Sequence, residues 1–504
     1  MRSLTLTFAL ALSATILNAD DYSLKSPSQV TRPWIAPEIW TTPMMDWQLN
    51  KGRVEITQGG RGHDLQLLTH QMKAGDGSFR MSVRTGELNA HSKGGAAGFR
   101  FAVTGAMPNE YRSGLFSSNG VNAGITTEGK LFIGGKFSPE TLNVALLDDV
   151  RLDLEIICKG SNASATITAK SGNGSVAVIG EFSAKVKSDP LIGNIGLFAG
   201  PIDNQGQSNA SRRAGGNGDF RFWFKDWSVS GDKIAAKPEQ RFGPLLWSQY
   251  TVHDNIMKMT AHVAPVGPHE NKVVILSIKE GSKWNPVRRA AIDPLSRTAH
   301  FRIEAWDSAK NADYRLSFDY ATARGTVTDH WDGVIRKDPV DQKEIKLAAL
   351  SCMVDYAFPN QYISESVRAQ NPDLVFFAGD QIYESVAGYS VVRTPTVNEV
   401  PRAALNYLQK YWLFGWSFRD VLKDRPSVII PDDHDVYHGN IWGNGGMAMP
   451  KIAKTTSSFG GYNMHPKWVN MVHRTQVSHL PDAYDPTPIK QGITVYHTEL
   501  NVGG

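Results

Sequence analysis

Potential metal ligands follow three apolar stretches in the last third of the chain. Cys352 follows the first stretch, Asp380 and Tyr383 follow the second, and Asp433 and His434 follow the third. A carboxylate can bridge hard cations, a thiolate and a phenolate suit ferric iron or another strongly Lewis-acidic metal, and an imidazole can donate a proton. Together these residue types predict a metal-assisted hydrolytic reaction.

The three apolar stretches are predicted to be buried strands of an α/β unit. They cover residues 345–350, 374–378 and 427–430, and segments of helical composition at 360–370 and 402–422 separate them. Apolar strands that alternate with helices indicate a parallel sheet covered on its faces. Because ligands of such sheets gather beyond the carboxyl ends of the strands, we expect the three sets of side chains to converge on one site.

Each of these residues also has a structural explanation when taken alone. Cys352 could be a small buried hydrophobe, Tyr383 a core aromatic and Asp380 a turn residue, while Asp432–Asp435 could cap a helix. Their occurrence together, in order and after strands, favours the metal site. Four further polar residues lie close by and stay outside the predicted set: Asp355, Asp432, Asp435 and Asn440.

The spacing of these residues resembles the alkaline phosphatase D (PhoD-like) family, a branch of the calcineurin-like metallophosphoesterases. The wider superfamily has Gly-Asp-x-x-Asp and Gly-Asn-His-Asp/Glu where this chain has Gly379-Asp380-x-x-Tyr383 and Asp432-Asp433-His434-Asp435. Here Ser351-Cys352 also replaces the usual Asp-x-His. All three departures are typical of the alkaline phosphatase D branch.

The resemblance implies a role for each residue. Cys352 and Tyr383 would bind ferric iron, and Asp380 would bridge it to a second position, occupied by calcium in the family, with zinc or manganese as alternatives. Asp433 would bind the second metal, and His434 would donate a proton to the leaving oxygen. The implied activity is hydrolysis of phosphoesters by a metal-bound hydroxide. Small-molecule monoesters and phosphodiester polymers both remain open as substrates.

The front of the chain predicts a different architecture. Short alternating runs between Gly, Asn and Ser clusters indicate a concanavalin-like β jelly roll over residues 20–234. The phrase 224–231 resembles the last strand of such domains, which often bind carbohydrate. Trp223 and Trp227 alternate with polar residues on this strand, so we expect them in the core rather than on a glycan-binding surface.

Two further domains are expected behind the jelly roll. Residues 240–340 suit an immunoglobulin-like or fibronectin type III sandwich, which is also similar to the domain that precedes the catalytic domain in the PhoD-like branch. By the same resemblance, residues 345–504 would form an αββα metallophosphatase domain that is incomplete. Binuclear phosphoesterases of this kind take metal ligands from both halves of the domain, and only the first half is matched here. We expect a strand at 493–498 and a longer parent chain.

The termini and composition indicate an exported protein. Residues 1–19 have a charged start and a short apolar run, as in a signal peptide, and predict a periplasmic or extracellular location. The 53 Lys and Arg against 49 Asp and Glu give a formal charge of +4, too small to indicate a specific nucleic-acid partner. No other stretch has the length of a membrane helix, and two cysteines exclude a disulfide scaffold.

The competing function is a non-catalytic, exported glycan-binding protein with a remnant phosphatase domain.

Overall fold

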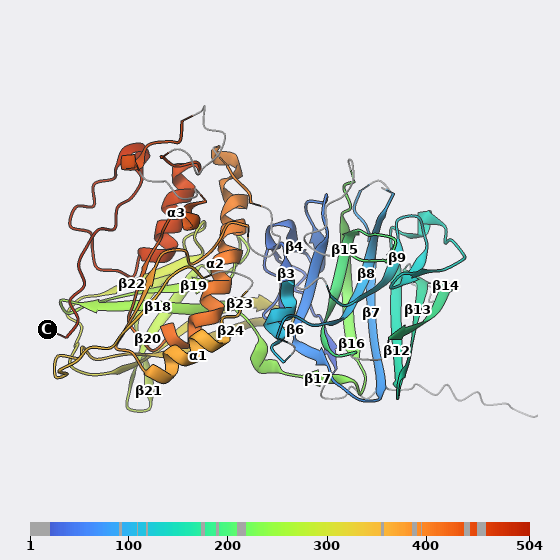
Figure 1. The fold of residues 1–504 in the computed structure, drawn as a ribbon, viewed down its shortest axis with the longest axis horizontal. Helices are drawn as coiled ribbons and strands as arrows, with labels where there is room; N and C mark the ends of the chain where they lie inside the picture. Colours follow the sequence, from blue (N-terminus) through green and yellow to red (C-terminus); the bar gives the residue numbers. More distant parts are fainter. Residues whose placement is uncertain are drawn as a thin grey trace, which may run out of the picture.

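The computed structural model describes most of the chain. The described residues are 21–89, 93–107, 109–116, 119–172, 177–187, 191–208, 218–353, 357–385, 391–394, 396–437, 444–450 and 460–503. The expected signal segment 1–19 lies outside them, as do Asp355 and Asn440. Figure 1 shows one β-sandwich at one end of the molecule, and the helices together with a second set of strands at the other.

The N-terminal sandwich consists of two antiparallel sheets. One sheet contains nine strands: β1 (Tyr22–Ser23), β2 (Thr31–Arg32), β4 (Trp47–Asn50), β5 (Arg53–Ile56), β7 (Gly77–Glu87), β12 (Val150–Lys159), β13 (Asn162–Ser171), β14 (Val178–Lys187) and β16 (Phe222–Ser230). The other contains eight: β3 (Ile39–Thr42), β6 (His63–Met72), β8 (Gly95–Val103), β9 (Val121–Thr126), β10 (Leu131–Ile133), β11 (Lys136–Phe137), β15 (Gly193–Pro201) and β17 (Ile234–Ala236). The predicted jelly-roll architecture is therefore confirmed.

The period-two pattern of these strands places their apolar side chains between the two sheets. The neighbouring strands β7 and β12 pair through Met81 and Leu154, both buried. Trp223 and Trp227 are also buried, as expected from the alternation of β16. Neither indole is therefore available on the surface for stacking against a sugar.

Seven antiparallel strands follow the sandwich. A three-stranded sheet contains β18 (Leu245–His253), β19 (Ile256–Val263) and β22 (Thr298–Ile303). A four-stranded sheet contains β20 (Val273–Glu280), β21 (Lys283–Ala291), β23 (Ala312–Thr322) and β24 (Gly325–Ile335). Seven strands in sheets of three and four match the strand numbers of constant-type immunoglobulin domains. Their buried residues belong to one core with those of the helices that follow.

The last part of the chain contains a parallel sheet. Its strands lie in the order β25 (Leu347–Leu350), β26 (Leu374–Ala378) and β27 (Ser427–Ile430). The helices are α1 (Gln361–Gln370), α2 (Val400–Leu422) and α3 (Pro466–Val477). Helix α2 starts two residues before the predicted segment, with Pro401 in its first turn, where a missing N–H costs least. None of the helices among the described residues is long and apolar enough to cross a membrane.

Three expectations for this part need correction. None of the three strands is fully buried: Leu347 on the edge strand β25 is 56% exposed, and buried residues alternate with partly exposed ones along β26 and β27. The segment 493–498 is not a strand; Ile493 makes only an isolated bridge to Ile489, since no strand of the described chain lies beside it. The described residues of 345–504 form this single three-stranded sheet, so the expected αββα sandwich is not shown.

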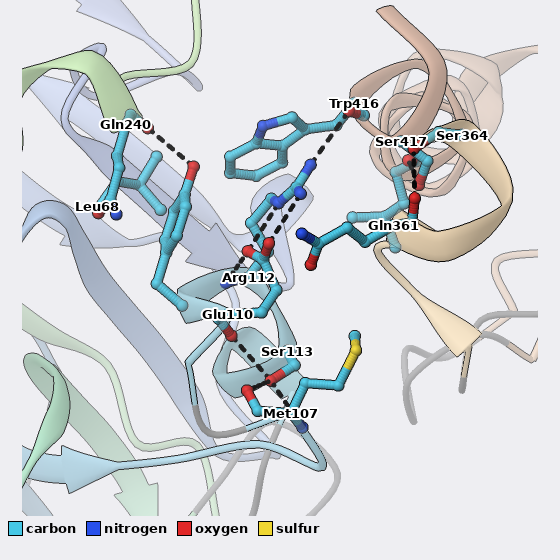
Figure 2. A network of polar contacts seen from close by, with 12 residues as sticks. Leu68, Met107, Glu110, Arg112, Ser113, Gln240, Gln361, Ser364, Trp416 and Ser417 are labelled. Atoms are coloured by element: carbon cyan, nitrogen blue, oxygen red, sulfur yellow. Dashed lines mark hydrogen bonds and ion pairs between the residues drawn. The ribbon is translucent and has the colours of Figure 1, made fainter. Parts of the chain in front are cut away.

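Helix α2 contacts both β-domains. Gly415 faces the indole of Trp247 on β18, at a separation that leaves no room for a larger residue. Toward the N-terminal sandwich, Figure 2 shows Arg112 between Glu110 and Trp416. The Arg112 guanidinium donates to both Glu110 carboxylate oxygens at 2.8 and 2.9 Å and to the backbone oxygen of Trp416 at 3.3 Å. The helix is thus held from two sides.

Candidate metal centre

A glycine allows the carboxyl ends of β26 and β27 to lie close together. A Cβ on Gly379 would lie 2.4 Å from the Cβ of Asp432, so only glycine lets these two strand ends approach. Gly379, Asp380 and Cys352 all have positive φ, at 86°, 54° and 59°. For Asp380 and Cys352 this conformation is strained, and strain of this kind gathers at functional sites.

Hydrogen bonds then join the three loops that follow the strands. The Cys352 amide donates to the Gly379 oxygen at 3.2 Å, and the Met353 amide donates to the Asp380 oxygen at 2.8 Å. The Gln381 side chain donates to the Ile430 oxygen at 3.0 Å. The first loop is therefore bonded to the second, and the second to the third.

All five residues predicted from the sequence meet at this edge. Asp380, Asp433 and His434 each offer a ligand atom, and these atoms lie within 4.8 Å of one another. The Tyr383 hydroxyl donates to Asp380 Oδ2 at 3.0 Å, and Cys352 Sγ lies 3.6 Å from the same oxygen. The structure thus places the five side chains together; their roles as ligands and acid remain predictions.

The donor set fits a cation. Asp380 Oδ1 is buried and has no hydrogen-bond partner within the described chain, although buried polar atoms are almost always paired. Burial raises the pKa of Asp433, and the nearby Asp380 adds to that rise. Burial, with Cys352 and Asp380, also raises the pKa of Tyr383. A bound cation would offset these costs and favour the anionic forms of the ligands.

His434 has a partner that the sequence reasoning missed. Its Nδ1 lies 2.6 Å from Glu384 Oε2, and Arg393 lies 3.7 Å from the other oxygen of this carboxylate. The bond to Glu384 raises the pKa of His434 to about 9. The Glu384 carboxylate therefore orients the ring and leaves Nε2 as the nitrogen that can serve a substrate. The one sequence feature that could have indicated this partner is the position of Glu384 directly after Tyr383.

The neighbouring acids are structural. Asp435 is fully buried, accepts from the Asp432 amide and the Gln476 side chain at 2.9 Å each, and has its pKa raised to about 7 by burial. Asp432 Oδ1 accepts from the Asp433 amide at 2.9 Å. These bonds shape the turn η8 (His434–Val436) that carries the imidazole.

The other histidines of residues 345–504 that the structure describes have different surroundings. His465 caps α3, His473 and His479 are buried, and His497 is exposed beside the ring of Tyr484. His438 lies outside the described residues. The two cysteines are both free, Cys158 buried and Cys352 exposed.

Comparisons with known proteins found similarity in solved structures alone. No family model matches the chain, and no curated protein matches it. Arcelin-5, a lectin-like defense protein from Phaseolus vulgaris, is 14% identical over 42% of this chain and 99% of its own, with a TM-score of 0.29. The carbohydrate recognition domain of Emp47p is 15% identical over 44% and 98%, with a TM-score of 0.27. The VIP36 exoplasmic/lumenal domain, in a Ca²⁺/Man3GlcNAc-bound form, is 8% identical over 44% and 94%, with a TM-score of 0.23.

Proposed function

We propose that the chain is an exported, metal-dependent phosphoesterase of the alkaline phosphatase D type. The observation that carries the proposal is Asp380, a buried carboxylate with one unpaired oxygen, surrounded by the other four predicted ligand and acid residues. An arrangement of this kind is costly without a cation and useful with one. The phosphoester substrate itself rests on the resemblance of the two motifs.

The proposed function assigns metal binding and proton donation to different residues. Cys352, Asp380, Tyr383 and Asp433 would hold two metals, ferric iron and calcium, with zinc or manganese as alternatives. Bound cations would supply neutralisation of the phosphoryl oxygens and activation of a water molecule. His434, held through Nδ1 by Glu384, would donate a proton from Nε2 to the leaving oxygen.

Metal analysis combined with phosphoester assays tests the proposal. The full chain should bind metal and hydrolyse p-nitrophenyl phosphate or bis(p-nitrophenyl) phosphate, and the choice between them assigns monoesterase or diesterase activity. The exposed His497→Ala provides a matched control for His434→Ala. Metal-loaded protein without activity on either ester would refute the proposed enzymatic function. It would favour the alternative, a non-catalytic protein with a remnant phosphatase domain.

Glycan binding by the N-terminal sandwich is the second candidate function. Of the two functions expected from the sequence, it is the one that the comparisons favour, because the similar solved structures carry the names of lectins or carbohydrate recognition domains. The burial of Trp223 and Trp227 means that such a site would have to use other side chains. A glycan array with the full chain tests it, and absence of any bound glycan would count against it.

We also propose that the protein is exported to the periplasm or beyond. The proposal rests on the charged and apolar pattern of residues 1–19. N-terminal sequencing of the mature protein should begin at or near Asp20. A mature chain that still begins at Met1 and stays in the cytoplasm would contradict it.

A further inference from the structure

Helix α2 carries buried polar side chains that the site described above does not explain. Asn406, Gln409 and Lys410 are each exposed by 1% or less. Burial lowers the pKa of Lys410 to about 7, which measures how unfavourable the position is for an ammonium group. Side chains of this kind are kept in a core only when each of their polar groups has a partner.

Toward the candidate metal centre, Lys410 joins the two loops that carry His434 and its partner. Its ammonium group donates to the backbone oxygen of Glu384 at 2.5 Å, to the Tyr437 hydroxyl at 2.8 Å and to Asn406 Oδ1 at 3.1 Å. Asn406 Oδ1 also accepts from the Tyr437 hydroxyl at 3.1 Å. The three donors of the ammonium group are thereby used.

These acceptors lie at the two ends of the His434–Glu384 contact. Glu384 holds the imidazole, and Tyr437 ends the turn η8 with a left-handed φ of 58°. The Lys410 ammonium group therefore holds both the backbone of Glu384 and the side chain of Tyr437, the residue that ends the turn carrying His434. A shift of either loop would break the 2.6 Å contact between His434 and Glu384.

Toward the N-terminal sandwich, the same helix is bonded at its start and middle. Arg402 Nη2 lies 2.5 Å from Asp46 Oδ1, and Asp46 is buried in the short turn η1 (Met44–Asp46). The Gln409 side chain accepts from the Met44 amide at 2.8 Å and donates to the Thr41 oxygen at 2.6 Å. Both partners of Gln409 are backbone groups of β3 and η1, so the contact fixes the helix against the sandwich.

We propose that Lys410 and Asn406 are positioning residues for His434, and that the N-terminal sandwich holds them in place through Gln409 and Arg402. The sandwich then supports the candidate site, in addition to any ligand that it binds itself. The proposal rests on the proposed phosphoesterase function for its consequence in catalysis. The brace itself, from η1 through α2 to the loops of Glu384 and His434, rests on the bonds just described.

Amide hydrogen exchange, followed by mass spectrometry on the full chain, tests the brace without reference to activity. Lys410→Met keeps the length of the side chain and removes its donors, so the core stays filled. We expect exchange in residues 380–385 and 432–437 to become about tenfold faster, the equivalent of one lost hydrogen bond to a charged group. Lys423→Met, at the partly exposed end of the same helix, is the matched control and should change neither segment.

Gln409→Leu tests the connection to the sandwich in the same experiment. Faster exchange in residues 39–46 together with 380–385 and 432–437 is expected. Faster exchange in residues 39–46 alone would show that the sandwich does not hold the site and would overturn that half of the proposal. Unchanged exchange of 380–385 and 432–437 in Lys410→Met would overturn the other half.

The dependence of rate on the leaving group tests the role in catalysis. Poor leaving groups need the proton from His434 more than p-nitrophenolate does. Lys410→Met should therefore lower kcat about tenfold for alkyl phosphoesters and about twofold for p-nitrophenyl esters, with metal content unchanged.

Equal losses for both classes of ester, or loss of metal, would contradict a role through His434. A wild-type protein that hydrolyses neither class would refute the proposed function, and amide exchange alone would then decide whether the brace exists. Ester hydrolysis thus tests the proposed function, and amide exchange tests the brace independently of it.

Discussion

The contact between Gly415 and Trp247 predicts an inverted effect of a common helix substitution. Replacing glycine by alanine in the middle of an exposed helix stabilises it by about 1 kcal/mol. At Gly415 the added Cβ would lie 2.4 Å from Cε2 and Cζ2 of Trp247. The indole cannot retreat easily, because it also stacks on the ring of His262, with the two ring centroids 4.0 Å apart.

The magnitude follows from two opposing terms. The gain in helix propensity of about 1 kcal/mol is set against an overpacking cost of about 1–3 kcal/mol for a methyl group forced into a filled core. Because Trp247 and His262 are both buried, the indole has little space to move into, and the overpacking cost should lie at the upper end of this range. We expect Gly415→Ala to lower the opening free energy of α2 by about 1–2 kcal/mol.

Native-state amide exchange across α2 measures this opening free energy in the full chain. Trp247→Phe is the matched partner, because it removes the part of the indole that the Cβ would touch. Relative to the sum of the two single changes, the double variant should be more stable by about 1–2 kcal/mol. Stabilisation by Gly415→Ala alone, or additivity within about 0.5 kcal/mol, would refute the packing argument.

Three further predictions concern the site and the core. Asp380→Ala and His434→Ala should each abolish phosphoesterase activity, and kcat within a few-fold of wild type in either variant would reject their roles. Iron-loaded protein should be coloured by charge transfer, and Tyr383→Phe should bleach or shift the absorption band; a colourless, iron-free and active protein would point to zinc or manganese. Burial lowers the pKa of His479 to about 3, so its stabilising contribution is complete above the unfolded pKa of about 6.5. It should be lost at about 1.4 kcal/mol per pH unit as the pH falls below that value, and His479→Gln should reduce the slope of unfolding free energy against pH.

The sequence predicted the candidate site more closely than its surroundings. Short apolar runs that alternate with helical segments indicate parallel strands, and the carboxyl ends of parallel strands share one edge of the sheet. That geometry places Asp380 beside Asp433 and His434, as the structure has it. The alternation at 493–498 misled because a strand also needs a neighbour to bond with, and local pattern does not supply one.

The residues around the site could not be predicted in the same way. Lys410 lies on a helix, where a lysine ordinarily indicates the solvent face. Its ammonium group is satisfied by Asn406 one turn earlier and by Glu384 and Tyr437 on two other segments. Gln409 bonds to a strand more than three hundred residues away in sequence. Such roles depend on tertiary contacts that no periodicity encodes.

The bonding of α2 to the N-terminal sandwich has a consequence for how such a chain can change. The interface between the sandwich and α2 depends on matched residues on both sides. Asp46 pairs with Arg402, and the backbone of Thr41 and Met44 bonds to Gln409, so the two sides should change together in evolution. A chimera that joins this sandwich to a foreign α2 would remove Arg402 from the buried Asp46 carboxylate and leave it only the longer contacts to His63 at 3.4 Å and Arg61 at 4.0 Å. The natural unit of recombination in this chain is therefore the sandwich together with α2, although the two are far apart in sequence.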